Sequence, residues 1–439
     1  MSGAEIVEET VMSRIVEPDP SAFSGEDARF VRDFAVLCGI GAAEHGGVHR
    51  LAGSAADGEQ RRWFAELLKS EGFSVEFDRI GNQFGLLEFT PGAPFVVVGS
   101  HLDSQPTAGR YDGAYGVLAA AHAAFGLASQ WRLAGIIPQY NLAVVNWFNE
   151  EGARFKPSMM GSSVYTGKMP LAEALATVDA SGVTVSEALS SIGCLGDGPG
   201  PVAAFCAEIH IEQGRSMERN GVTIGVVDSN WAANKYEFVV HGEQAHTGST
   251  VIEDRRDALL GASLLVVAAR EVADLFPGVL HTSVGQLDVY PNSPVVVPSR
   301  VNLLLDLRSA DEAVLAEADD LLHQRIREIE AAANVSIEQG SSHSWPVTPY
   351  QPEGVELAEK TAANLGLSHR RVKTLAGHDS TNMKDIVPTV MLFVPSVDGI
   401  SHNEHEYTRD EDIVAGLHML TNVVRSLCNG ELSSGAADD

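Results

Sequence analysis

Histidine and carboxylate side chains recur in short groups along this chain, each close to the end of an apolar run that is typical of a buried strand. The residues concerned are His101, Asp112, Glu150, Glu151, His210 and His402. Neutral imidazole and carboxylate are ligands that zinc and manganese bind well. In an open α/β sheet, ligands bind at the carboxyl ends of the strands, so these side chains can meet there. The pattern predicts a site for divalent metal ions.

Two of these carboxylates, Glu150 and Glu151, are neighbours in the chain, which indicates separate roles. Adjacent side chains cannot easily reach one ion from the same direction, so one can bind metal while the other remains a free general base. A bound metal lowers the pKa of water from about 15.7 to about 7, and a free carboxylate within reach then accepts the remaining proton. Asp103, close behind His101, is placed to orient that imidazole. The group therefore suits hydrolytic chemistry.

The elements that must position these side chains alternate between strands and helices. Apolar or alternating runs predict strands at residues 73–77, 85–89, 95–98, 141–148 and 389–394. Helical spacing predicts helices at residues 57–70, 117–128, 355–365 and 410–427. This alternation is typical of the α/β class, with a mainly parallel mixed sheet flanked by helices.

The middle of the chain follows a different order. Predicted strands lie at residues 236–241, 282–289, 300–308 and 334–338, and predicted helices at residues 254–275 and 311–332. The order β-α-β-β-α-β is that of a ferredoxin-like unit. We therefore expect an inserted α+β domain over residues 229–340, and a discontinuous catalytic domain formed by residues 1–228 and 341–439. Residues 1–20 and 429–439 are expected to be disordered.

The overall composition argues against several classes of partner. The net charge of −29 disfavours nucleic acids and anionic membranes, because binding to either requires clustered Lys and Arg. No apolar run reaches the length of about 18 residues that a membrane span needs, and the acidic N-terminus lacks the pattern of a signal peptide. The four cysteines form no CxxC pair, which is typical of reduced thiols. We therefore expect a cytoplasmic protein.

Five short motifs, taken together, resemble those of one enzyme family. They are His101-Leu-Asp103, Tyr111-Asp-Gly113, Asn149-Glu-Glu-Gly152, His210-Ile-Glu-Gln-Gly214, and Ser401-His402 followed by Glu406. In this order they resemble the M20-type metallohydrolases, and within them the amidase, hydantoinase and carbamoylase branch. That branch includes N-carbamoyl-L-amino-acid hydrolases, allantoate amidohydrolases and β-ureidopropionases. The similarity runs from about residue 30 to residue 428, which is nearly the whole chain.

The resemblance implies two divalent metal ions, with zinc as the first expectation and manganese, cobalt or nickel as alternatives. Carried over to this chain, it places His101 and His210 on one ion and Glu151 and His402 on the other. Asp112 would bridge the two ions.

The same resemblance assigns the general base and the role of the inserted domain. Glu150 would be the general base, and the inserted domain would act as a lid and as the surface of a homodimer. In the family, a histidine of this domain reaches the active site of the partner subunit and stabilises the developing oxyanion. Here that residue is His246. Such a donor contributes roughly 2.7–4 kcal/mol if values for oxyanion holes apply.

The match is looser for the residues that would bind the substrate. The family binds the substrate carboxylate with an arginine at the end of a lid strand, which corresponds to Arg308. A guanidinium group suits a carboxylate because it can donate two parallel hydrogen bonds. The family's usual asparagine upstream of this arginine is replaced by Val295, and Asn292 lies just before it. The replacement removes a polar contact with the substrate.

Two further segments are expected near the substrate. Gln213 lies beside His210 and could bind the scissile carbonyl or ureido group. The loop Gly377-His-Asp-Ser380 resembles a family loop with alanine in the last position. His378 is expected to contact the substrate and Asp379 to support the metal ligands; the alternative is that both residues only support the ligands.

The main hypothesis is a two-metal hydrolase that cleaves a linear amide or ureido C–N bond in a small anionic metabolite. The alternative is an aminoacylase or dipeptidase acting on N-acyl amino acids, because an apolar Val295 could suit an acyl chain. A non-catalytic relative would lack a ligand or the base, and all are present. A mononuclear iron oxygenase uses two histidines and one carboxylate, which leaves the third histidine and the other carboxylates unexplained.

Overall fold

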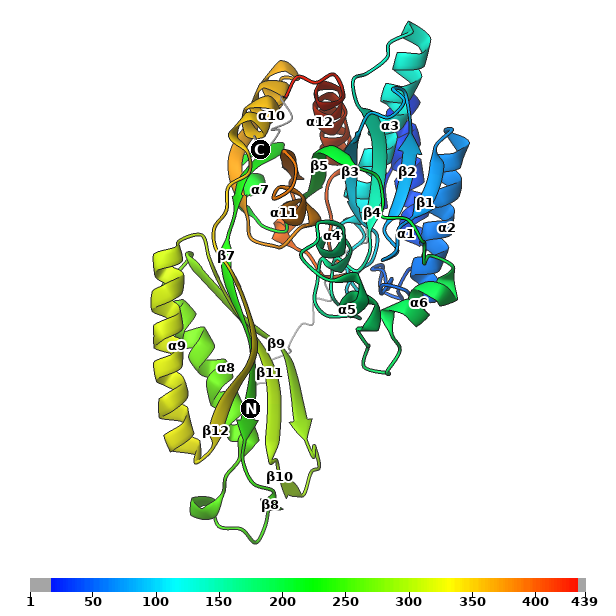
Figure 1. The fold of residues 1–439 in the computed structure, drawn as a ribbon. Coiled ribbons are helices and arrows are strands. Elements are labelled where there is room, and N and C mark those ends of the chain that lie inside the picture. The colour runs from blue at the N-terminus through cyan, green and yellow to red at the C-terminus, as the bar shows by residue number, and fades with distance from the viewer. Residues whose placement is uncertain (1–16, 433–439) are drawn as a thin grey trace, which may run out of the picture. The chain divides into compact units, whose positions relative to one another are not determined.

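The structure, a computed structural model, describes residues 17–432, which divide into two compact units (Figure 1). Unit 1 contains the described residues up to Asp228, together with Tyr350–Val372 and those from Gly377 onwards. Unit 2 contains Ser229–Pro349 and Lys373–Ala376. Unit 2 is thus inserted into the sequence of unit 1.

Unit 1 is built on an eight-stranded mixed sheet. In spatial order its strands are β1 (Ser74–Phe77), β2 (Gln83–Leu87), β4 (Asn141–Trp147), β3 (Phe95–His101), β5 (Ala203–Ile211), β14 (Thr389–Val394), β6 (Ile224–Asn230) and β13 (His369–Thr374). The central strands β4, β3, β5 and β14 are parallel, whereas β1, β2 and β6 form antiparallel pairs. Every residue of β3, β4 and β14 is buried, as expected for strands covered on both faces. The predicted mainly parallel mixed sheet is confirmed.

Helices flank this sheet, and separate apolar clusters lie on its two faces. The helices of unit 1 are η1 (Pro20–Ala22), α1 (Gly25–Gly39), α2 (Ala55–Ser70), α3 (Ala114–Ala134), α4 (Met160–Tyr165), α5 (Leu171–Ala176), α6 (Val185–Ile192), α7 (Ser216–Asn220), α10 (Pro352–Asn364), α11 (Asp379–Met383), η3 (Val397–Gly399) and α12 (Asp410–Cys428). Along β3, Val96 and Val98 face the cluster that contains α3, whereas Val97 faces the cluster that contains Met383 of α11. This alternation follows from the two-residue period of a strand.

Helix α3 fills the larger of these clusters. It packs against β3, β4 and β5 on one side and against α1 and α12 on the other. Its buried residues are mostly alanines, which allow the helix to lie close to its neighbours. Because α3 begins directly after Asp112 and Gly113, its packing also determines where Asp112 lies.

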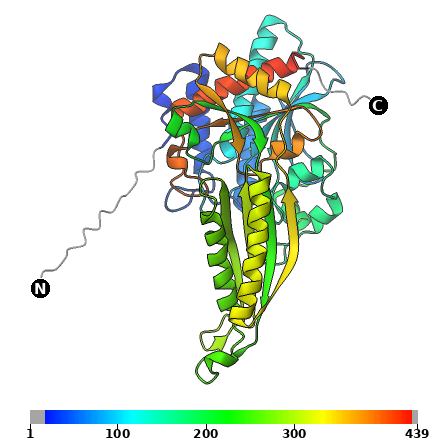
Figure 2. The same cartoon turned by 90° about the vertical axis from the view of Figure 1, so that its left-hand side faces the viewer.

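Unit 2 contains a four-stranded antiparallel sheet with two helices on one face (Figure 2). Its strands, in spatial order, are β12 (Ser336–Trp345), β7 (Ala232–His241), β11 (Arg300–Ser309) and β9 (Leu280–Tyr290), and its helices are α8 (Ala258–Asp274) and α9 (Glu312–Ala333). The short strands β8 (Ala245–His246) and β10 (Val296–Val297) form a separate ribbon, and η2 (Ile252–Asp254) precedes α8. In chain order the main elements follow the predicted β-α-β-β-α-β pattern.

Apolar and polar side chains alternate along the predicted strand at residues 300–308 because its two faces have different surroundings. Val301, Leu303, Leu305 and Leu307 are buried in the cluster between the sheet and the two helices. Asp306 and Arg308 alternate with them and therefore lie on the opposite, open face of the sheet.

The last strand of unit 2 is longer than the sequence predicts. Residues 334–338 were expected to be a strand followed by a linker, but β12 continues to Trp345. Its register against β7 shifts between Gln339 and Ser342, so a bulge carries the strand through a polar segment without apolar alternation. As a result unit 2 extends to Pro349 rather than to residue 340.

The chain ends are described only in part. The predicted disorder at residues 1–16 and 433–439 lies outside the described residues. Residues 17–20, also expected to be disordered, include Glu17, whose carboxylate lies 2.9 Å from a guanidinium nitrogen of Arg110. Residues 429–432 follow the last turn of α12.

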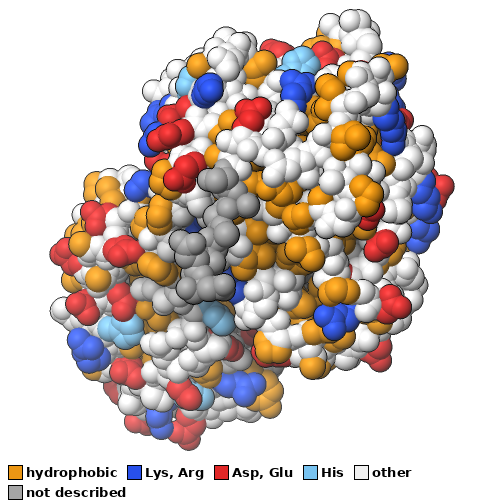
Figure 3. All heavy atoms as spheres, turned by 45° about the horizontal axis from the view of Figure 1, so that its top comes forward, with side chains coloured by type: hydrophobic (Ala, Val, Ile, Leu, Met, Phe, Trp, Pro, Cys, Tyr) orange, Lys and Arg blue, Asp and Glu red, His pale blue; other side chains and the backbone are white. Residues whose placement is uncertain are grey.

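Three features of the described residues concern the predicted partners and location: the hydropathy of the helices, the surface charge and the state of the cysteines. No helix among residues 17–432 has both the length and the apolar character that crossing a membrane requires. On the face seen in Figure 3, the Lys and Arg side chains of described residues are interspersed with acidic ones. All four cysteines are free and buried. A cytoplasmic location stays a prediction.

Candidate metal centre

The predicted metal ligands come together at the carboxyl ends of the central strands of unit 1. His101 ends β3, His210 lies at the end of β5, and Glu151 follows β4. Asp112 lies just before α3, and His402 follows β14 on the loop beyond η3. Because β3, β4, β5 and β14 run parallel, their carboxyl ends share one edge of the sheet.

Asp112 is shared by two groups of candidate ligand atoms. Its Oδ1 lies 3.3 Å from Nε2 of His101 and 3.1 Å from Nε2 of His210. Its Oδ2 lies 3.2 Å from Nε2 of His402, and that nitrogen lies 3.4 Å from Oε2 of Glu151. Within each group the candidate ligand atoms lie within 4.8 Å of one another. Each oxygen of Asp112 therefore faces a different group, as a bridging carboxylate requires.

The two buried imidazoles are oriented by backbone carbonyl groups. Nδ1 of His101 lies 3.0 Å from the carbonyl oxygen of Asp103, and Nδ1 of His210 lies 3.0 Å from the carbonyl oxygen of Ile211. In the neutral ring a proton on Nδ1 makes each of these hydrogen bonds, so the lone pair is on Nε2; in His210 this nitrogen accepts a hydrogen bond from the backbone N–H of Gly113 at 3.0 Å. This is the tautomer that a metal ligand needs, so the donor set fits a divalent cation.

Gly113 allows the close approach between the Asp112 loop and His101. Its φ of 63° lies in the left-handed region, and a Cβ at this position would lie 2.4 Å from the His101 ring. Any side chain here would displace the imidazole from the shared carboxylate.

The carboxylate of Asp103 has a different partner from the one expected. It lies 3.8 Å from Nδ1 of His101, beyond hydrogen-bond distance, because the Asp103 carbonyl oxygen already takes that position. Its two oxygens instead accept hydrogen bonds from the backbone N–H groups of Glu150 and Glu151, at 3.2 and 3.3 Å. Asn149, with a φ of 53°, turns the chain into this position. Asp103 thus holds the two neighbouring glutamates at the edge of the sheet.

Glu150 and Glu151 occupy different places. Glu151 belongs to the ligand group of His402 and accepts a hydrogen bond from the side chain of Gln105 at 3.0 Å. Glu150 belongs to neither group, although its Oε2 lies 3.5 Å from Nε2 of His101. Burial raises the pKa of Glu150 well above its usual range, and the charges of Asp379, Glu151 and Asp112 raise it further, against the opposing effect of His101.

The remaining pKa shifts reflect carboxylates and imidazoles packed together. Burial and the charge of Asp112 raise the pKa of Glu151 to about 7. Burial alone would lower the pKa of His402, but its hydrogen bond to Asp112 and the charge of Glu151 raise it to about 9. The pKa of Asp112 is lowered well below its usual range against the effect of burial, chiefly by the charge of His210. The acidic cluster thus favours positive charge at its centre.

Gln213 contacts the candidate ligands themselves. Its Nε2 donates a hydrogen bond to Oδ2 of Asp112 at 2.7 Å and lies 3.2 Å from the hydroxyl of Ser401. Its φ of 57° is in the left-handed region, a strained conformation that is frequent at functional sites. Its predicted contact with the substrate stays a prediction.

His378 packs beside a candidate ligand, whereas Asp379 lies deeper. The His378 ring centroid is 4.5 Å from that of His210. Burial and the charge of His210 lower the pKa of His378 well below its usual range, so its imidazole is neutral near pH 7. Asp379 begins α11, and burial together with the charge of Glu208 raises its pKa well above its usual range. The roles predicted for both residues stay predictions.

Two buried glutamates near the centre were not predicted from the sequence. Glu208 accepts hydrogen bonds from the hydroxyl of Ser100 at 2.7 Å and the backbone N–H of Ser380 at 2.8 Å. Glu208 is an acidic residue inside the apolar run of β5, and this position could have indicated a buried carboxylate. Glu406 accepts hydrogen bonds from the backbone N–H groups of Tyr111 and Asp112. Glu406 belongs to the motif of Ser401 and His402, but its distance in sequence from Tyr111 and Asp112 hides these partners.

Three of the residues predicted to bind the substrate or the oxyanion lie in unit 2: His246, Arg308 and Asn292. Nδ1 of His246 accepts hydrogen bonds from the backbone N–H groups of Gly248 and Ser249 at 3.0 and 3.1 Å. Nε and Nη2 of Arg308 donate to the two carboxylate oxygens of Asp306, at 2.9 and 2.8 Å. Asn292 is exposed and has a φ of 53°.

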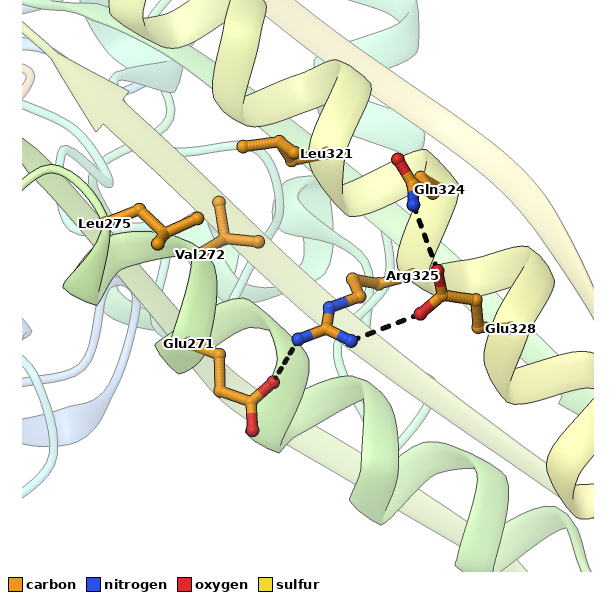
Figure 4. A pocket seen from close by; sticks show the side chains of 7 residues that line it. All are labelled: Glu271, Val272, Leu275, Leu321, Gln324, Arg325 and Glu328. Carbon is orange, nitrogen blue, oxygen red and sulfur yellow. Dashed lines mark hydrogen bonds and ion pairs between the residues drawn. The ribbon is translucent and has the colours of Figure 1, made fainter.

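These observations do not place the three residues at the metal centre. The centre lies in unit 1, and His246, Arg308 and Asn292 lie in unit 2. Their predicted roles therefore stay predictions. The pocket between α8 and α9, also in unit 2, contains none of the predicted site residues (Figure 4).

Comparisons with known proteins agree with the motifs. Residues 97–426 match the family model described as peptidase family M20/M25/M40. A Mycolicibacterium smegmatis protein whose description names no substrate is 58% identical over 421 residues, covering 94% of this chain and 96% of its own. An N-carbamoyl-L-amino-acid amidohydrolase of Rhizobium meliloti is 38% identical over 397 residues, covering 88% and 92%.

A solved structure shows the same fold over nearly the whole chain. It is an amidase of the hydantoinase/carbamoylase family from Burkholderia vietnamiensis, with a TM-score of 0.87 and 36% identity. The match covers 93% of this chain and 98% of that one. Its motifs, its fold and these similarities show that this chain belongs to peptidase family M20/M25/M40.

Proposed function

We propose that this chain is a two-cation hydrolase that cleaves a linear amide or ureido C–N bond in a small anionic metabolite. The observation that carries the proposal is the shared Asp112, with imidazole and carboxylate ligands gathered at each of its oxygens and Glu150 outside both groups. The similarity to an N-carbamoyl-L-amino-acid amidohydrolase supports the bond type. Zinc, or alternatively manganese, cobalt or nickel, suits histidine and carboxylate ligands without cysteine.

The proposed reaction uses Glu150 as the proton carrier. Divalent cations bound at these ligands would polarise the substrate carbonyl and lower the pKa of the attacking water. Glu150 accepts the proton of that water on a carboxylate oxygen and passes it to the leaving nitrogen. A raised pKa suits both steps. It makes the carboxylate a better acceptor for the proton of the water, and the resulting carboxylic acid can then donate that proton to the nitrogen. Hydrolysis of a ureido substrate yields an amine, carbon dioxide and ammonia.

His246 is proposed as the donor to the developing oxyanion. Since Nδ1 of His246 accepts two backbone hydrogen bonds, the proton of the neutral ring is on Nε2. The exposed Nε2–H is then a hydrogen-bond donor of fixed tautomer. In the proposed dimer this histidine serves the active site of the partner subunit.

Arg308 is proposed to bind the substrate carboxylate. Asp306 takes the Nε and Nη2 side of the guanidinium, and the carbonyl oxygen of Leu375 accepts from Nη1 at 2.8 Å. Five N–H groups are available on an arginine, so donors on the Nη1 and Nη2 end remain for an anion. Asp306 thus orients Arg308 without using all of its donors. Asn292 is proposed as a further contact with the substrate.

The alternative function, an aminoacylase or dipeptidase acting on N-acyl amino acids, rests on Val295. This residue is 61% exposed at the start of the β8–β10 ribbon, where the related enzymes commonly have asparagine. An apolar side chain at this position suits an acyl chain better than a carbamoyl group.

A homodimer through unit 2 is proposed from its exposed apolar face. Helix α8 exposes Leu260 and Val267 by 49% and 53%, and Leu275, which directly follows the helix, is 64% exposed. Their spacing places them along one side of the helix. In the pocket between the two helices, Arg325 of α9 pairs with Glu271 of α8 and with Glu328 of its own helix (Figure 4). Light scattering of the protein and of a Val267→Glu variant tests this proposal, with a monomeric variant expected.

The function is tested by measuring ammonia and amine release from protein reconstituted with divalent cations. The substrates are N-carbamoyl amino acids, allantoate, ureidopropionate and N-acyl amino acids. Ammonia together with an equal amount of amine from an N-carbamoyl amino acid supports a carbamoyl hydrolase. Amine release from N-acyl amino acids alone supports the alternative. Failure to hydrolyse any amide or ureide, with cations bound, contradicts both.

A further inference from the structure

Glu406 is a buried carboxylate that lies outside both ligand groups and still holds the residue they share. Only 2% of it is exposed. Its Oε1 accepts hydrogen bonds from the backbone N–H groups of Tyr111 at 2.8 Å and Asp112 at 3.0 Å. Its Oε2 accepts one from the hydroxyl of Ser401 at 2.8 Å. We propose that Glu406 is a positioning residue, which fixes the backbone at Asp112 so that the two carboxylate oxygens of Asp112 face the two groups of candidate ligands. This inference rests on the proposed two-cation function.

The two backbone contacts constrain Asp112 more than one contact would. Successive N–H groups that converge on one oxygen fix the orientation of two neighbouring peptide planes. The ring of Tyr111 is fully buried, with its centroid 5.0 Å from that of Phe34 and 5.9 Å from that of Tyr407. The residue before Asp112 is therefore held through both its side chain and its N–H group.

Glycines in the loop that carries Asp112, residues 109–113, allow Glu406 and His101 to approach closely. A Cβ at Gly109 would lie 2.1 Å from the carboxylate carbon of Glu406, so only glycine allows this approach. On the other side of Asp112, Gly113 allows the His101 ring to lie against the loop. The loop is thus held between an anionic acceptor and a candidate ligand.

Ser401 links the same carboxylate to the second ligand loop. Its Oγ lies 2.8 Å from Oε2 of Glu406 and 3.1 Å from Oδ2 of Asp112. A hydroxyl has one proton, so Ser401 can donate to only one of these carboxylates at a time, and the shorter contact is the one with Glu406. Because Ser401 directly precedes His402, Glu406 holds both the loop of the shared carboxylate and the loop of a candidate ligand.

Two effects of Glu406 can be separated by substitution. One is the hydrogen bonds to the backbone, which depend on the length of the side chain and on an acceptor oxygen. The other is negative charge near the cations. Glu406→Gln keeps the length and an acceptor oxygen but removes the charge. Glu406→Asp keeps the charge but is one methylene shorter, and Glu406→Ala removes both.

The experiment measures cation affinity of the full-length, metal-stripped protein. Manganese or zinc is titrated in competition with a chelator, and bound cations per chain are counted by elemental analysis. We expect Glu406→Ala and Glu406→Asp to bind about 10- to 100-fold more weakly, as is typical for residues that orient metal ligands. We expect Glu406→Gln to recover most of this loss. Glu404→Gln, in the same loop, is the control for the loss of one negative charge.

The outcomes distinguish this inference from the proposed function. If wild-type protein takes up fewer than two cations, the two-cation function fails, whatever Glu406 does. If wild type binds two cations and folded Glu406→Ala binds them equally tightly, the positioning role is wrong. It is equally wrong if Glu406→Asp matches wild type while Glu406→Gln does not, because charge alone would then explain the effect. Should Glu406→Ala fail to fold, the comparison of Asp with Gln still decides.

Discussion

The candidate metal centre of unit 1 and the predicted recognition residues of unit 2 differ in how tightly the fold holds them. His101 and His210 are each 1% exposed and Asp112 is 5% exposed. By contrast, His246 and Asn292 are exposed, and Val295 is 61% exposed. Each buried ligand has a hydrogen-bond partner that sets its orientation, so a change there alters the chemistry. A change at an exposed residue of unit 2 is expected to alter substrate preference at little cost in stability.

The largest effect is expected at Glu150. Glu150→Gln should lower turnover by about 10²- to 10⁴-fold, because the amide cannot accept the proton of the attacking water. Cation binding should persist, since Glu150 lies outside both ligand groups. Glu151→Gln is the matched comparison, because it should lose both activity and one cation. Near-normal turnover in Glu150→Gln would show that Glu150 is not the general base.

A smaller loss is expected at His246, and it tests the dimer at the same time. His246→Ala should lower kcat by about 10²- to 10³-fold, as for other oxyanion donors. When His246→Ala and Glu150→Gln chains are mixed and reassembled, part of the activity should return, because one of the two sites then has an intact His246 and Glu150. No recovery from a confirmed mixed dimer would mean that His246 does not act across subunits.

Arg308 is expected to affect substrate binding more than turnover. A charge-assisted hydrogen bond contributes about 1.5–3 kcal/mol, so Arg308→Ala should lower kcat/KM by about 10- to 100-fold, mainly through KM. Asp306→Asn should have a smaller effect in the same direction, since it weakens only the orientation of Arg308. Arg300→Ala, on the same strand, is the control. An unchanged KM for Arg308→Ala would exclude it from the substrate site.

Cation affinity should depend on pH. In the metal-free protein the pKa of His402 is raised to about 9 and that of Glu151 to about 7. Cation binding requires a neutral imidazole and an ionised carboxylate, so protons are released on binding below these values. Affinity should therefore rise with pH between about pH 6 and pH 9 and level off above. Calorimetry in two buffers of different ionisation enthalpy measures the protons released, and none released at pH 7 would be the contrary result.

The smallest effect on stability is expected at Val295. Val295→Asn restores the polar side chain that related enzymes commonly have and should raise the ratio of carbamoyl to acyl hydrolysis. Because the side chain is exposed, the free energy of unfolding should change by less than about 0.5 kcal/mol. The ratio of kcat/KM for the two substrate types, with a denaturation curve, checks both statements. An unchanged ratio would show that Val295 does not set the preference.

The sequence predicted much of the fold because apolar periodicity is local. The strand at residues 389–394 matches β14, and the helix at residues 410–427 matches α12 to within one residue. Helix α1, Gly25–Gly39, was not predicted, although its buried residues recur with helical spacing. The sequence did not reveal the length of β12, because this strand lacks apolar alternation and is held by pairing with β7.

The candidate site was predictable in its residue types but not in its contacts. The motifs identified the five candidate ligands because His101 and His210 lie at the ends of strands, Asp112 precedes a helix, and Glu151 and His402 lie on loops that follow strands. The actual partner of Asp103 could not be predicted, because its carbonyl and its carboxylate compete for the same imidazole and only geometry decides. The contact between Glu406 and Asp112 spans 294 positions in the chain, and no local pattern encodes it.

We infer that one carboxylate, Asp112, joins two cations in a hydrolytic centre. The most direct measurement is the number of cations bound per chain, by elemental analysis, during stepwise reconstitution of metal-stripped wild type, with hydrolysis of an N-carbamoyl amino acid assayed at each step. We expect two cations per chain and full activity only when both are bound, with Asp112→Asn retaining at most one. Full activity with a single cation per chain would contradict this inference.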